Sequence, residues 1–224
     1  MIITTNRLTA ASGVCAALAG AIFIGVQIGH PHLDAHSIQT TEMAVRDTLK
    51  VAMAALALAG FTGMYLSQVR RNGVLGLIGY LVLSAGYLMV MGTAFVAAFV
   101  IPSVAASNPE YANDVIAATT GGSPVGDIGA LAMVAKIQGF AYLAGGLIFG
   151  IALFRARVLA RWATLLLAAG GLVSAALSMM PDAFYRLLAF PNGIAMIGLG
   201  VSLWVSRRNL AVTRTGASYA SAIR

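Results

Sequence analysis

All the histidines of the chain lie close together in the stretch IGHPHLDAHS, where His30, His32 and His36 surround Asp34. An extended backbone would place the four side chains on one face, and a helix would set His32 and His36 one turn apart. Either arrangement presents imidazoles and a carboxylate to a divalent metal such as zinc, copper or nickel. The alternatives are a pH-sensing role and an ordinary polar rim at the end of a membrane span, and the sequence leaves all three open.

A second group of candidates is cationic. Arg46, Lys50 and Lys136, with Gln138 close to the last of them, could form a patch that binds an anionic ligand or a lipid headgroup. The alternative is that both lysines extend their stems to the membrane interface. Glu42 precedes Arg46 by four residues, so the two can pair along one helix face.

The third group is a set of tyrosines within apolar segments. Tyr80, Tyr87 and Tyr142 could anchor a lipid or a small apolar molecule through their hydroxyl groups. Cys15 is the only cysteine, which excludes an intramolecular disulfide and a cysteine zinc site. We expect no cofactor other than a divalent metal at the histidines, because no apolar segment carries a histidine that could ligate haem.

The elements that position these residues are membrane-spanning helices. The chain is 59% hydrophobic and only 9% charged over 224 residues, unlike a soluble domain. A helix needs roughly 20 apolar residues to cross a bilayer. The sequence therefore predicts an all-α polytopic domain over residues 1–206 and a disordered basic tail over 207–224. The six predicted spans are 8–28, 48–68, 74–102, 129–153, 162–180 and 183–205.

Charge predicts the orientation of these spans. If the spans alternate, most of the basic residues fall on one side: Arg7, Arg70, Arg71, Arg155, Arg157, Arg161, Arg207, Arg208, Arg214 and Arg224. The positive-inside rule then places both termini in the cytoplasm, and the protein in the cytoplasmic membrane. The net charge of +7 is accordingly a topology signal, and we expect no nucleic-acid partner because no basic domain or aromatic surface accompanies it.

Two polar segments, 29–47 and 103–128, are predicted to lie outside and to converge near the outer surface. Asn108 and the proline after it resemble a helix cap and first turn, so we expect a surface helix over 109–118. We also expect Asp127 to cap the fourth span. In the last span, Pro191 predicts a kink, or else a separate interfacial helix before it.

Three longer stretches resemble a known group of proteins. They are NRLTAASGVCAALAGAIFIGVQIGHP, AFVAAFVIP and the hairpin LAGGLIFGIALFRARVLARWATLLLAAGGLVSAA. They are similar to uncharacterised multi-pass membrane proteins of actinobacteria, which often have a proline before the Arg-Trp pair where this chain has Ala160. The resemblance implies a six-span bundle and supplies no catalytic residues.

Three functions remain open from the sequence. The first is a protein that binds or passes a small ligand or lipid from the outer face. The second is an accessory or sensory subunit that packs against a membrane-protein partner or forms a homo-oligomer, for which the Gly25/Gly29 and Gly146/Gly150 pairs would allow close approach. The third is a metal-dependent membrane enzyme that uses the histidines. An activity as an enzyme is the least favoured, because no catalytic motif accompanies them.

Overall fold

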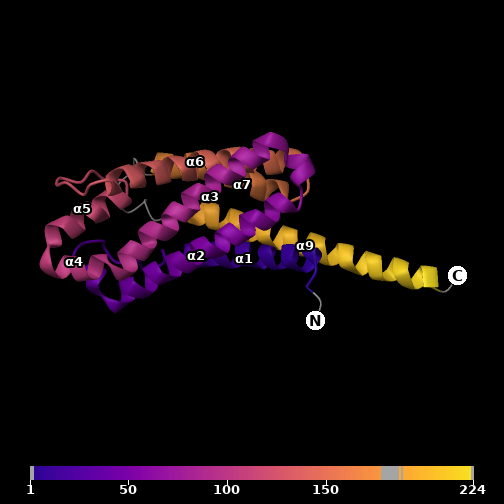
Figure 1. Cartoon of the computed structure of the whole chain (residues 1–224), viewed down its shortest axis with the longest axis horizontal. Helices are drawn as coiled ribbons and strands as arrows, with labels where there is room; N and C mark the ends of the chain where they lie inside the picture. The colour runs from indigo at the N-terminus through magenta and orange to yellow at the C-terminus, as the bar shows by residue number, and fades with distance from the viewer. Residues whose placement is uncertain (1–2, 178–186, 188, 223–224) are drawn as a thin grey trace.

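The computed structural model consists of helices that lie along one long axis (Figure 1). It describes residues 3–177, 187 and 189–222, and side chains for 3–173, 187 and 189–209. No strand occurs among these residues. The all-α class predicted from the sequence is confirmed.

In the described part of the chain, five helices are long and apolar enough to cross a membrane. They are α1 (Thr5–Gly25), α2 (Thr41–Leu66), α3 (Val69–Phe99), α6 (Leu131–Ala156) and the first part of α9 (Ala189–Ala222). The first four overlap the predicted spans 8–28, 48–68, 74–102 and 129–153. A further helix, α7 (Arg161–Leu177), is apolar but shorter. The predicted spans 162–180 and 183–205 run partly into 178–186 and 188, which lie outside the described residues.

Close backbone contact holds α3 against α6. A Cβ atom added to Gly86 would lie 2.8 Å from the backbone nitrogen of Tyr142, and one added to Gly145 would meet the backbone of Leu83. Within a bilayer, burial of apolar surface gives little net attraction between helices, so van der Waals contact between closely placed backbones is a main source of stability. The glycines of this pair therefore set how near the two helices come.

The first and last helices meet in the same way. A Cβ on Gly13 would lie 2.7 Å from the carbonyl oxygen of Gly200, and Gly20 is similarly close to the backbone of Gly193. The pairing is antiparallel, which brings the start of α1 beside the middle of α9 (Figure 1). Two distant parts of the sequence are thus joined through glycines.

Of the two glycine pairs named from the sequence, only one lies between helices. A Cβ on Gly150 would lie 2.6 Å from the backbone nitrogen of Ala168 in α7, and Gly146 is in ordinary contact with the same helix. A Cβ on Gly25 would meet no described residue within 4 Å, so the use of Gly25 and Gly29 against a partner or a second copy stays a prediction. Gly29 has a φ of +62° and serves the turn after α1.

Aromatic rings fill the centre of the bundle. The ring of Phe61 lies edge-on to Tyr87 at 5.0 Å and to Phe149 at 6.2 Å, and all three side chains are buried. These rings come from α2, α3 and α6, so one cluster ties three helices together. Edge-to-face pairs of this kind add to the attraction between the helices.

A second, smaller core lies at the end of the bundle away from the chain termini (Figure 1). It joins residues 30–40, including η1 (Ser37–Gln39), to residues 101–130, including α4 (Ile101–Ser107) and α5 (Pro109–Thr119), and we name these two segments the cap. The backbone N–H of Ala35 donates to Oδ1 of Asn113 at 2.8 Å. The predicted convergence of the two polar segments is thus confirmed.

The details of the cap confirm one sequence prediction and correct another. Helix α5 covers the expected surface helix, and Oδ1 of Asn108 accepts a hydrogen bond from the backbone of Tyr111 at 3.1 Å. Asp127 does not cap α6: its carboxylate accepts from the N–H of Gly129 at 2.7 Å, and the cap residue of α6 is Ala130. Because Asp127 lies before the turn at Gly129, its side chain closes that turn instead.

Helix α9 bears on the predictions for Pro191 and for the basic tail. Its described part begins at Ala189, so Pro191 lies in the first turn, where a proline is tolerated because it needs no backbone N–H partner. The alternative interfacial helix lies almost entirely outside the described residues. At the other end the helix backbone continues to Ala222, and the disordered tail over 207–224 stays a prediction. No proline follows Pro191, so nothing in the sequence forces the helix to stop.

We predict that Gly145→Ala destabilises the protein, because the new methyl group would press against the backbone of Leu83. Overpacking of this kind costs about 1–3 kcal/mol. Thermal unfolding in mild detergent would measure it. The matched control is Gly92→Ala on α3, where a Cβ has nothing within 4 Å and the better helix propensity of alanine keeps stability equal or higher. Equal unfolding midpoints for the two variants would contradict the tight α3–α6 contact.

Candidate functional site

Arg46 caps the end of α1. Its Nη1 donates to the carbonyl oxygens of Val26 at 2.7 Å and Ile28 at 3.1 Å, and its Nη2 to that of Gly29 at 3.2 Å. The predicted ion pair with Glu42 is confirmed at 2.7 Å. The guanidinium therefore satisfies carbonyl groups that a helix end leaves unpaired. These bonds give Arg46 a structural role, and its part in a cationic ligand patch stays a prediction.

The two lysines of the expected patch have different surroundings. Nζ of Lys50 pairs with Asp47 at 2.7 Å, and the Asp47 side chain is 3% exposed. Lys136 is exposed on α6 and makes no ion pair with any described residue. Among the three cations, only Lys136 has no hydrogen bond or ion pair of its own within the described structure, and the ligand patch stays a prediction.

Gln138 joins two helices. Its Oε1 accepts a hydrogen bond from the hydroxyl of Thr93 at 2.9 Å, which connects α6 to α3. Bonds of this kind are common between membrane helices, since each polar group needs a partner away from water. Thr93, one partner in this bond, lies on the side of α3 that faces the cap.

The tyrosines lie inside the bundle and are engaged there. Tyr80 stacks on Tyr65 with ring centroids 4.8 Å apart, and its hydroxyl lies 2.9 Å from that of Thr62. The hydroxyl of Tyr87 donates to the sulfur of Met196 at 3.3 Å, and its ring lies 5.4 Å from that of Tyr142. None of the three lines the cavity described below. The tyrosines act as interhelical contacts here.

The histidine stretch forms a tight turn at the start of the cap. Nδ1 of His30 lies 2.9 Å from the carbonyl oxygen of Pro31, while His32 and His36 are exposed. Within residues 3–177, 187 and 189–222, no three side chains of His, Cys, Asp or Glu gather where they could hold a metal ion. The metal and pH-sensing interpretations stay predictions that this geometry does not favour.

Asp34 explains the shape of that turn. Its Oδ1 accepts from the backbone N–H of His36 at 2.9 Å and of Ser37 at 2.6 Å. The bond from Ser37 is the main reason why the pKa of the Asp34 carboxyl is lowered, against a smaller opposing effect of desolvation. A side chain that bonds the backbone two and three residues ahead is the usual way in which Asp starts a turn.

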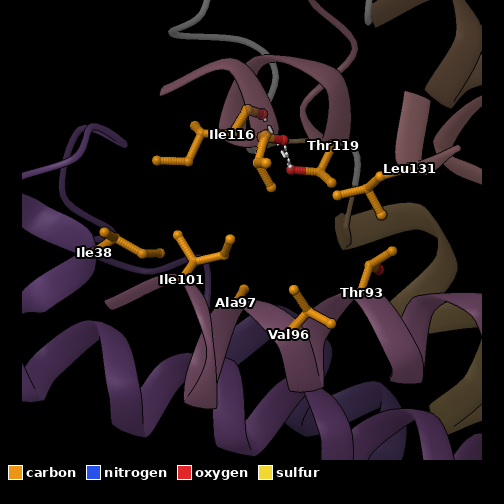
Figure 2. A pocket seen from close by; sticks show the side chains of 9 residues that line it. Ile38, Thr93, Val96, Ala97, Ile101, Ile116, Thr119 and Leu131 are labelled. Carbon is orange, nitrogen blue, oxygen red and sulfur yellow. Dashed lines mark hydrogen bonds between the residues drawn. The ribbon is translucent and has the colours of Figure 1, made fainter. Parts of the chain in front are cut away.

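The structure places a cavity between the cap and α3 (Figure 2). Its volume is about 20 Å³, which exceeds the roughly 10–15 Å³ needed for one water molecule. The lining is apolar apart from two threonines, and comes from the cap, α3 and α6: Ile38, Thr93, Val96, Ala97, Ile101, Val115, Ile116, Thr119 and Leu131.

The hydroxyl protons of the two threonines are both donated in hydrogen bonds. The hydroxyl of Thr93 donates to Gln138, and that of Thr119 donates to the carbonyl oxygen of Val115 at 2.9 Å. Each hydroxyl oxygen keeps lone pairs that can accept a bond. The lining is therefore apolar, with two hydroxyl oxygens that can each accept a hydrogen bond.

The sequence did not indicate a cavity at this place. Thr93, Val96 and Ala97 lie within a span and have the composition of any lipid-facing helix. The useful signal is in α5, where Ala112 and Val115 are buried although the polar Asn113 and Asp114 lie between them. Apolar residues at this spacing on a surface helix indicate a covered face.

Comparison with known proteins finds no matching family model, curated protein or solved structure. The resemblance to actinobacterial membrane proteins stays a prediction.

We predict that Arg46→Gln lowers the free energy of unfolding by about 2 kcal/mol, because charge-assisted bonds to the end of α1 are lost. Chemical or thermal unfolding in detergent would measure the change. Lys136→Gln removes the same charge from a side chain without an ion pair in the described structure, and should leave stability unchanged. A similar loss in both variants would mean that net charge, and not the α1 cap, matters.

The turn at Asp34 should depend on pH. Because its pKa is lower in the folded chain, the carboxylate stabilises the turn fully above the unfolded value of about 3.9, and this stabilisation is lost as the pH falls through the folded value. Hydrogen exchange at the His36 and Ser37 amides should quicken below that range. Asp34→Asn keeps an acceptor oxygen without the titration, so its exchange should lack this acid-induced step. An identical step in the variant would assign it to another group.

Proposed function

We propose that the chain is an integral protein of the cytoplasmic membrane that binds or passes a small apolar molecule or lipid at its outer face. The observation that carries the proposal is the apolar cavity between the cap and α3. Sites for small molecules are usually apolar, with a few polar groups that fix orientation. Thr93 and Thr119 are the polar groups here.

The proposed topology has six spans and both termini in the cytoplasm. In support, α7 contacts both α6 and α9 and so belongs to the same bundle as the five longer helices. The basic turns before α3 and α7 lie at the same end as the start of α1, opposite the cap (Figure 1). The positive-inside rule then orients the cap outward.

Ligand entry requires the cap to move. The cavity as it stands admits a water-sized molecule, whereas a fatty alcohol needs a larger space. The cap has a hydrophobic core separate from that of the bundle, so it can shift without disturbing the aromatic cluster. A long-chain alcohol supplies both the apolar tail and the single donor that the threonine oxygens can bind.

A photoactivatable fatty alcohol would test the proposal on protein in lipid nanodiscs. Cross-linking should occur at Ile101 and Val115, which are 3% and 4% exposed and are thus shielded from bulk lipid. Ala97→Phe fills the cavity and should abolish this labelling. The control is Ala85→Phe, on the exposed face of the same helix, which should leave it unchanged.

The labelling pattern decides the outcome. Cross-links confined to exposed residues such as Phe95 and Phe99 would report ordinary contact with the bilayer and overturn the proposal.

A further inference from the structure

At the end of the bundle opposite the cap, the turn between α2 and α3 buries two amide side chains. Gln68 and Asn72 are each 5% exposed. Neither the nitrogen nor the oxygen of either amide has a hydrogen-bond partner among the described residues. Buried polar groups almost always have partners, so these four atoms indicate a molecule that completes them.

Backbone geometry holds Asn72 in this buried position. Gly73, the next residue, has a φ of +56° and a ψ of −158°, which breaks the helix there. The side chain of Asn72 packs against Gly76, where any larger residue would collide with it. Two glycines thus fix a polar side chain where a membrane helix would otherwise carry an apolar one.

Arg207 of α9 adds a third unpaired group. Its Nη2 donates to the carbonyl oxygen of Ser67, the neighbour of Gln68, at 2.8 Å. Its Nε is buried and makes no hydrogen bond within the described structure. The backbone oxygen of Arg207 accepts from Asn6 at 2.9 Å, so this position is tied to α1 as well.

The surface around these groups is strongly positive. Arg70 and Arg71 are exposed and form no ion pair with a described residue. Every described acidic residue lies between Asp34 and Asp127, in the cap or the adjoining first turns of α2. No carboxylate of the described chain therefore competes for the arginines at this end.

The unpaired atoms specify the chemistry of the ligand. Guanidinium groups suit a phosphate. The amides leave both donors and acceptors unpaired, which a hydroxyl group can satisfy because it does both. We propose that the α2–α3 turn, with Arg207, binds the headgroup of an anionic phospholipid that carries hydroxyl groups, as phosphatidylglycerol does. This site is independent of the proposed cavity at the cap.

Native mass spectrometry would count the lipids that stay bound after the protein leaves nanodiscs of equal phosphatidylglycerol and phosphatidylcholine. The wild type should retain phosphatidylglycerol selectively. Arg70→Gln/Arg71→Gln should weaken this retention about tenfold or more, as expected when charge-assisted hydrogen bonds are lost. The control is Arg155→Gln/Arg157→Gln, which removes the same charge from the C-terminal end of α6 and should retain the lipid.

A second pair of variants tests the amides. Gln68→Leu/Asn72→Leu removes the unpaired polar atoms, so the empty protein should unfold at an equal or higher temperature and yet lose phosphatidylglycerol. Unchanged retention in this variant would mean that buried water satisfies the amides, and equal loss in both arginine pairs would mean diffuse attraction. Either result overturns the site.

The last arm separates two sources of phosphate. Inorganic phosphate added to lipid-free protein should leave the unfolding temperature unchanged, because it lacks the hydroxyl-bearing headgroup and the acyl chains. A rise that Arg70→Gln/Arg71→Gln abolishes would assign the site to free phosphate instead of a lipid.

Discussion

Contact between backbones is the constraint on which the rest of this structure depends. In a bilayer the lipid chains are as apolar as the side chains, so a helix gains little by exchanging one for the other. The glycines at 13, 20, 86, 145, 193 and 200 let helix backbones approach until a single methyl group would collide. The gain is dispersion attraction summed over many atoms. Close approach at these points also leaves the aromatic rings of Phe61, Tyr87 and Phe149 to fill the remaining space at the centre.

The polar ends of the helices pose the opposite problem, since their last carbonyl groups have no partner within the helix. Arginine solves it at both ends of the bundle. Arg46 of α2 binds three carbonyls after α1, and Arg207 of α9 binds the carbonyl that ends α2. A guanidinium suits this task because its donors point in several fixed directions and it stays charged. Two arginines that look like ligand or topology residues are therefore also part of the scaffold.

The sequence predicted interactions between residues close together in the chain, and it did not predict those between residues far apart. Apolar runs predicted the helices. The Asn108 cap and the Glu42–Arg46 pair were also predictable, because the partners in each lie within one helical turn of each other. Contacts between distant residues were not accessible. The bonds from Arg46 to Val26 and Gly29, and from Thr93 to Gln138, depend on how helices are placed side by side. The glycine spacing was informative only in part: Gly150 contacts a helix, whereas a Cβ on Gly25 would meet no residue that the structure describes.

The same distinction explains why the sequence does not reveal the candidate site. Histidines and lysines can be recognised in a sequence as candidate functional residues. The cavity is lined instead by apolar residues and two threonines, which come together only because the cap packs over α3 (Figure 2). Its two hydroxyls donate to partners on their own side, so neither bonds across the space. The cap is joined to itself by Ala35 and Asn113 and to α3 mainly by apolar contact. Apolar contact is not directional, so sliding of the cap breaks no specific bond across the cavity. An apolar guest that replaced those contacts would recover apolar burial, and this is the physical basis on which we propose binding at this junction.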